Sequence, residues 1–94
     1  MEWRDSNEKS TYNKEIEGFI LDKKGREVLL FNIVAIPQKR VEGGETVEYI
    51  YYQVNNYIPS KISTFFNDKT LEEVKELCEK ELKNFYRTLC YSQQ

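Results

Sequence analysis

The stretch EVLLFNIVAI, residues 27–36, limits the fold more than any other part of this 94-residue chain. Its β-branched and aromatic residues are typical of a β-strand. Side chains alternate along a strand, which predicts one face made of Leu29, Phe31, Ile33 and Ala35. The other predicted face holds Val28, Leu30, Asn32, Val34 and Ile36. Both faces are rich in apolar side chains, so we expect both to be covered.

Two further strands are expected beside this one. Residues 15–21 are strand-like, and the turn DKKGR that follows predicts a hairpin into the strand 27–36. Pro37 is expected to end that strand, and QKRVEGGET is expected to be a polar connection to a third strand, residues 47–55. Because these connections are too short for a crossover, the three strands are predicted to be antiparallel neighbours.

The C-terminal segment predicts an amphipathic helix over residues 71–90. Thr70 and Glu73 form a T-x-x-E capping box at its start. Apolar residues recur on one face at three- and four-residue steps, namely Leu71, Val74, Leu77, Cys78, Leu82, Phe85 and Leu89. We therefore predict an α+β fold, with a three-stranded antiparallel sheet and this helix packed on one face. Residues 15–94 form the single βββα domain, preceded by a flexible arm, residues 1–14.

The segment 57–66 remains ambiguous, since its spacing fits a short helix and its composition fits a fourth strand or a loop. This matters because one helix covers only one face of a sheet. The other face could be covered by this segment, by the arm through Trp3 and Tyr12, by a second copy of the chain or by another protein. Large apolar patches seldom stay exposed on monomers, and the sequence leaves these alternatives open.

Composition argues against catalysis, cofactors and metal ions. The chain has no histidine, which removes the commonest general base and the commonest metal ligand. Cys78 and Cys90 lie twelve positions apart on the predicted helix, about 18 Å along its axis, which is beyond disulfide reach. Two cysteines also do not make a zinc site. We therefore expect no enzyme, no cofactor and no metal site.

The charge and hydropathy patterns argue against membrane partners. Sixteen acidic and fourteen basic side chains give a net charge of −2, which provides no long-range attraction to anionic membranes. No apolar run reaches the roughly 20 residues of a membrane-spanning helix. The N-terminal residues lack the apolar centre of a signal peptide, so a cytoplasmic location is expected.

A protein-binding role is the first functional hypothesis. Four tyrosines fall within VEYIYYQVNNY, residues 47–57, and alternation places Tyr49 and Tyr51 on the uncovered face. Aromatic side chains are enriched at interface hot spots. The predicted contact residues are Trp3, Val28, Leu30, Val34, Tyr49 and Tyr51. The expected partner is another protein or a second copy of the chain.

Nucleic-acid binding is the alternative hypothesis, with tyrosines as stacking platforms on the sheet. The basic side chains for this role would be Lys23, Lys24, Arg26 and Lys61. This footprint is small for a chain of negative net charge, so the alternative ranks second.

The order of IEGFILDKKGREVLLFNIV, VEYIYYQVNN and DKTLEEVKELCEKELKNFY resembles the strand-strand-strand-helix plan of small phage and mobile-element proteins. These include anti-defence inhibitors of the anti-CRISPR type and the three-stranded arm-binding domains of phage integrases. The resemblance covers residues 15–89 as a layout. The inhibitor resemblance implies a stoichiometric protein that blocks a larger host defence complex by occupying one of its surfaces.

Overall fold

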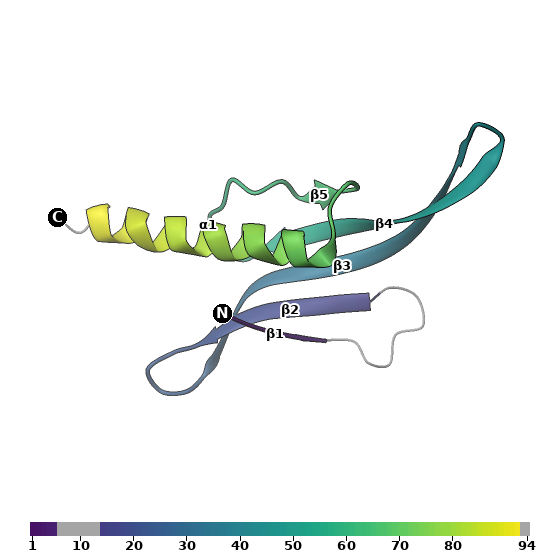
Figure 1. The fold of residues 1–94 in the computed structure, drawn as a ribbon. Helices are drawn as coiled ribbons and strands as arrows, with labels where there is room; N and C mark the ends of the chain where they lie inside the picture. The colour runs from purple at the N-terminus through teal and green to yellow at the C-terminus, as the bar shows by residue number, and fades with distance from the viewer. Residues whose placement is uncertain (6–13, 93–94) are drawn as a thin grey trace.

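The computed structural model describes residues 1–5 and 14–92, which form one antiparallel sheet with a helix on one face (Figure 1). Five strands lie side by side in chain order, namely β1 (Glu2–Asp5), β2 (Lys14–Leu21), β3 (Glu27–Glu42), β4 (Glu45–Asn56) and β5 (Phe65–Phe66). The helix α1 spans Leu71–Ser92. The α+β class, the antiparallel sheet and the C-terminal helix are confirmed. The sheet has five strands, however, where three or four were predicted.

The first strand corrects part of the expected flexible arm, because Glu2–Asp5 pair with β2. Trp3 lies opposite Gly18 and packs against the hydrophobic core. A Cβ atom added to Gly18 would come within 2.7 Å of Cζ3 of Trp3, so the indole ring occupies space that only glycine leaves free. The packing of Trp3 against Gly18 explains why the polar N-terminal segment pairs with the sheet. The rest of the expected arm, residues 6–13 with Tyr12, lies outside the described residues.

The prediction that QKRVEGGET forms a polar connection is wrong. β3 continues to Glu42 and β4 starts at Glu45, so only Gly43 and Gly44 form the turn. Both glycines have positive φ, 55° and 84°, as a two-residue type I′ hairpin turn requires. We call the resulting two-stranded extension, residues 36–51, the ribbon. Figure 1 shows the ribbon projecting past the start of α1, and it gives the molecule its longest dimension of 58 Å.

Pro37 does not end β3, because it lies where its missing N–H is not needed. β2 begins at Lys14, opposite Ala35, so the described residues provide no strand beside β3 beyond that point. Pro37 still pairs with Ile50 of β4 on its other side. A proline is tolerated at such a free edge of a sheet.

A β-bulge corrects the predicted faces of β3. Gly18 pairs with Phe31 and Phe19 pairs with Leu29, which leaves Leu30 as the extra residue. Leu30 and Phe31 are therefore both buried in the core under α1, with exposed fractions of 4% and 0%. An extra residue reverses the alternation of everything before it, a change that strict period-two counting cannot detect.

The bulge moves two neighbouring side chains to faces opposite to those predicted. Leu29 shares a face with Phe19, away from α1. Val28 shares a face with Ile20, which packs against the core on the helix side. The predicted faces of Phe31, Ile33 and Ala35, and those of the residues that alternate with them, are correct after the bulge.

The hydrophobic core lies between the sheet and α1. Its most deeply buried side chains, all at most 1% exposed, are Phe31, Ile33, Val54, Val74 and Cys78. The capping box is confirmed, since the Thr70 amide donates to Oε1 of Glu73 at 3.1 Å and the Glu73 amide donates to Oγ1 of Thr70 at 3.2 Å. The Thr70 amide also lowers the pKa of Glu73.

The segment 57–66 is mostly an extended loop that ends in the two-residue strand β5. Its side chains Ile58, Ile62 and Phe66 pack on the helix side, where they close the core beside β4. The segment therefore helps α1 to cover the face that was already covered. Among the described residues, no helix is long and apolar enough to cross a membrane.

Candidate functional site

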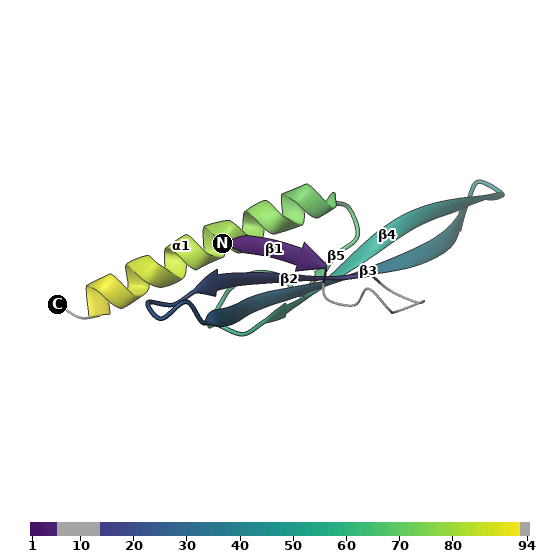
Figure 2. The same cartoon turned by 90° about the horizontal axis from the view of Figure 1, so that it is seen from below.

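We call the side of the sheet that points away from α1 the open face. No strand or helix of the described residues lies on it, as Figure 2 shows. The strand register places a group of apolar side chains together there, where β3 and β4 enter the ribbon. We call this group the ribbon patch, and it consists of Val34, Ile36, Val47, Tyr49, Tyr51 and Phe65.

Three aromatic rings belong to the ribbon patch, and Phe65 is its most exposed side chain. The rings of Tyr51 and Phe65 are stacked, with centroids 5.3 Å apart and an interplanar angle of 29°. Phe65 is 52% exposed although it is apolar. The guanidinium of Arg40 lies 5.1 Å from the ring centroid of Tyr49, in a cation–π contact. The patch thus combines stacked aromatic rings with an arginine.

A row of amide side chains forms one boundary of the ribbon patch. Nδ2 of Asn55 donates to Oδ1 of Asn32 at 3.0 Å, and Nε2 of Gln53 donates to Oδ1 of Asn55 at 3.4 Å. Asn32 is only 9% exposed, so its bond with Asn55 satisfies a carbonyl that would otherwise lose a partner on burial. These amides separate the ribbon patch from Phe19 and Leu29 further along the same face.

Arg4 shields Phe19 from solvent. Its guanidinium lies 4.5 Å from the ring centroid and also contacts Glu17 at 3.0 Å and Glu27 at 2.7 Å. These hydrogen bonds raise the pKa of Arg4 and lower that of Glu27. This end of the open face is therefore charge-balanced and capped over Phe19, while Leu29 and Leu21 remain 37% and 54% exposed there.

The structure brings together three of the six predicted protein-contact residues, namely Val34, Tyr49 and Tyr51. The other three, Trp3, Val28 and Leu30, lie on the helix side. Leu30 is buried in the core, whereas Val28 is 40% exposed beside Ile20. These side chains cannot form one surface with the tyrosines of the open face.

Trp3 is held against α1. Its Nε1 donates to Oε1 of Glu79 at 3.0 Å, and Nζ of Lys75 lies 5.8 Å from the ring centroid. Ile36, Val47 and Phe65 of the ribbon patch were not among the predicted contact residues, and Phe65 was not assigned to a face at all. Its signal was the β-like composition of ISTFF, which was too short to decide between a strand and a helix.

The residues of the nucleic-acid hypothesis come from two separate loops. Lys23, Lys24 and Arg26 lie in or beside the turn between β2 and β3, whereas Lys61 lies in the loop after β4. Nε of Arg26 is 2.8 Å from Oδ2 of Asp22. The backbone N–H of Arg26 donates to Oδ1 of the same carboxylate at 2.8 Å and lowers its pKa.

The basic side chains of the ribbon also have acidic partners. Lys39 lies 3.5 Å from Glu48, and Arg40 lies 2.8 Å from Glu42. Acidic groups thus balance the charges nearest the tyrosines. This arrangement is unlike a basic groove that follows a phosphate backbone.

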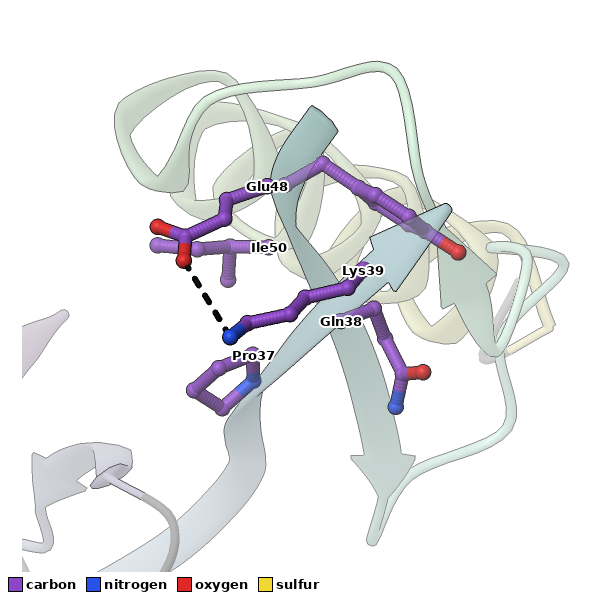
Figure 3. Close-up of a pocket in the computed structure, with 6 residues that line it drawn as sticks. Pro37, Gln38, Lys39, Glu48 and Ile50 are labelled. Atoms are coloured by element: carbon purple, nitrogen blue, oxygen red, sulfur yellow. Dashed lines mark ion pairs between the residues drawn. The ribbon is translucent and has the colours of Figure 1, made fainter. Parts of the chain in front are cut away.

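A shallow pocket lies on the ribbon and has a volume of about 640 Å³ (Figure 3). Its lining consists of Pro37, Gln38, Lys39, Glu48, Tyr49 and Ile50. Pro37, Lys39, Glu48 and Ile50 point to one side of the ribbon, the side opposite the ribbon patch, whereas Gln38 points to the other side. Ile50 is 47% exposed. The ribbon therefore presents apolar side chains on both of its faces.

Cys78 lies in the core, on the face of α1 that packs against the sheet. Burial raises the pKa of Cys78 to about 12, and the charges of Glu79 and Glu81 add to the effect, so this thiol stays protonated. The side chain of Cys90 lies outside the described residues. Among the described residues, no group of three or more His, Cys, Asp or Glu side chains could hold a metal ion. Comparisons of the chain with protein-family models, curated proteins and solved structures gave no match.

Proposed function

We propose that this chain is a non-catalytic protein-binding module that docks a partner protein on the ribbon patch. The observation that carries the proposal is the contrast between the two faces of β3 and β4. Ile33 and Val54 are sealed under α1, whereas stacked aromatic rings lie on the open face with no described helix or strand over them. Tyrosine and arginine are among the residue types enriched at interface hot spots, and Tyr49 with Arg40 supplies both.

The charges around the patch favour a protein over a nucleic acid. Arg4, Lys39 and Arg40 each lie within 4 Å of a carboxylate. A nucleic acid would have to compete with these carboxylates, and each phosphate contact would weaken with salt. A protein surface with both apolar and mixed charged groups suits such a rim better.

A docking module with no chemistry of its own would act stoichiometrically, by occupying a surface of its partner. Inhibition of a larger protein complex is one form of this action. The layout resemblance to small anti-defence proteins agrees with that form of the proposal, in which the partner belongs to a host defence complex.

Site-specific photo-crosslinking tests the proposal. A photo-reactive phenylalanine analogue replaces Tyr51 in one variant and Glu76, an exposed residue of α1, in a matched control. We expect the Tyr51 variant, in a lysate of the source cells, to give a discrete protein adduct that the control lacks. Excess unlabelled chain should suppress this adduct, whereas the Ile36→Glu chain should not, because a buried carboxylate in the interface is costly.

Three results would contradict the proposal. An adduct that nuclease removes would indicate nucleic acid, and an adduct with a second copy of the chain would indicate self-association. Equal labelling from Tyr51 and Glu76 would remove the evidence for a specific surface. Circular dichroism of the Ile36→Glu chain should match that of the unsubstituted chain, since Ile36 lies outside the core cluster.

A further inference from the structure

The two outer edges of the ribbon differ in their ability to accept another strand. In a two-residue hairpin, the residues that flank the turn exchange both backbone hydrogen bonds, and bonded pairs then recur at every second residue. Glu42 and Glu45 are that flanking pair. Counting from them, Thr46, Glu48 and Ile50 turn their backbone N–H and C=O groups away from β3, toward the outer edge of β4.

An observed hydrogen bond supports this count. The N–H of Val54, four residues beyond Ile50, donates to the carbonyl of Thr64 at 2.9 Å, on the side of β4 that faces β5. The strand β5 pairs only with Tyr52 and Gln53, so it ends before the ribbon begins. In the part of the chain that the structure describes, no backbone group pairs with the outer edge of β4 at residues 46–50.

The opposite edge of the ribbon has one such donor removed. By the same count, the backbone groups of Pro37, Lys39 and Val41 turn toward the free edge of β3. Proline has no N–H to offer, and prolines on free edges prevent strand pairing. The ribbon thus has one edge that is blocked at its base and one that keeps all its donors.

We propose, on the basis of the protein-binding function above, that the partner contributes an extended segment that pairs antiparallel with β4 at residues 46–50. This segment continues the line of β5, which already runs antiparallel to β4. Main-chain hydrogen bonds supply affinity in such strand addition, and pockets for alternate side chains supply specificity. One face of the added strand extends the ribbon patch beside Tyr49, and the other lies beside the pocket that Ile50 and Pro37 line.

The charges and pocket define the partner segment. The Glu48 side chain is 76% exposed and points to the pocket side of the ribbon, where Nζ of Lys39 from β3 lies 3.5 Å from it (Figure 3). A basic residue of the partner fits on the other side of Glu48, opposite it on the added strand. An apolar residue fits opposite Ile50, which is 47% exposed. A second copy of this chain fits poorly, because antiparallel pairing of the two edges in full overlap would place Glu48 opposite Glu48 of the copy.

The test uses the full chain and a synthetic peptide of sequence Thr-Val-Thr-Lys-Thr-Val-Thr with blocked ends, which places Lys opposite Glu48. Amide hydrogen exchange is followed by NMR. In the free chain, the amides of Thr46, Glu48 and Ile50 should exchange fast. Saturating peptide should slow all three by at least about tenfold, whereas Val47 and Tyr49 should change little because they already bond to β3.

One peptide control and three protein variants isolate the backbone contribution. N-methylation of the lysine and of the residues two positions from it, whose N–H groups face β4, should abolish the protection. Glu48→Gln keeps the N–H and should weaken binding by only about two- to fivefold, as loss of an exposed ion pair does. Glu48→Pro should abolish binding, and Thr46→Pro provides a second variant that keeps the carboxylate.

The inference is overturned if the peptide does not bind at millimolar concentration, or if it binds without slowing Thr46, Glu48 and Ile50. Protection at Lys39 and Val41 instead would place the strand on the wrong edge. The Tyr51 crosslink tests the protein-binding function itself, independently of the peptide experiment. A specific crosslink with no edge protection would reject strand addition alone, whereas loss of the specific crosslink would reject docking on the patch.

Discussion

Ile33 and Val34 are neighbours in β3, yet they lie in opposite environments. Ile33 is 0% exposed beneath α1, whereas Val34 is only partly buried on the open face, where no described helix or strand covers it. Both are β-branched apolar residues in the same strand, so composition and propensity do not separate them. The comparison shows that an apolar pattern predicts which faces of a strand need to be covered. It does not predict which helix, strand or partner covers each face.

Truncation of one aromatic side chain on each face should give the largest contrast. Phe31→Ala removes a fully buried ring and should lower the free energy of unfolding by about 3–5 kcal/mol. Tyr51→Ala removes a partly buried ring that stacks on Phe65, and should cost about 1 kcal/mol. Urea denaturation measures both. If the two changes cost the same, Tyr51 is core filling and the docking surface loses its main anchor.

A methyl group at Gly18 should give the next largest effect, because it acts where β1 closes the covered face. The added Cβ would meet Trp3 at 2.7 Å, so Gly18→Ala should destabilise the chain by about 1–3 kcal/mol. The tryptophan fluorescence should shift to the red as the indole moves toward water. In a Trp3→Leu background the same change should cost clearly less. An equal cost in both backgrounds would show that the indole does not fill this space.

A change in the ribbon turn should have a smaller and more local effect. Gly44 has a φ of 84°, so Gly44→Ala forces a side chain into a strained region at a cost of about 1–2 kcal/mol. Thr46→Ala, close to the same turn, serves as a control without that strain. Hydrogen exchange should speed up at the amides that pair β3 with β4 between Gln38 and Tyr49, and should stay unchanged in β1 and β2. Faster exchange throughout the sheet would show that the ribbon and the covered core unfold together.

The smallest expected effect concerns Asp22 in the turn between β2 and β3. The backbone N–H of Arg26 and its guanidinium lower the pKa of this carboxyl in the folded chain. A lowered folded pKa stabilises the fold above the unfolded pKa, and the benefit is lost as the pH falls through the folded value. NMR should show the Asp22 carboxyl and the Lys24 amide titrating together, below the ordinary aspartate range. Titration at the ordinary pKa would contradict the hydrogen bonds.

The sequence predicts the helix and its cap well because Thr70 and Glu73 are close in the chain and their signals are local. It also predicts the hairpin at Asp22 and Gly25. The Asp22 side chain accepts backbone N–H groups of the turn, and Gly25 adopts a positive φ. The ribbon was not predicted because a proline in the middle of a sheet usually ends a strand, so β3 was expected to end at Pro37. Pro37 is tolerated because no strand of the described residues pairs with β3 on the β2 side at this position, which is a property of the tertiary structure.

Three of the six predicted contact residues lie in the ribbon patch, and tertiary structure again explains why the other three do not. Alternation placed Val34, Tyr49 and Tyr51 correctly because no irregularity lies between them and the centre of the sheet. It misplaced Val28 and Leu30 because the bulge at Leu30 reverses the faces, and nothing in the local sequence marks it. The position of Trp3 depends on a space above Gly18, a contact fifteen residues away that no pattern along the chain reveals.

Thiol labelling of two adjacent positions tests the contrast between the faces most directly. Single Ile33→Cys and Val34→Cys chains, in a Cys90→Ser background, are treated with a thiol reagent under native conditions, where the buried Cys78 should not react. We predict that Cys at position 34 reacts within a few-fold of a free thiol, whereas Cys at position 33 reacts only when the chain unfolds. Equal protection at both positions would mean that the open face is already covered in the isolated protein, and would contradict the account.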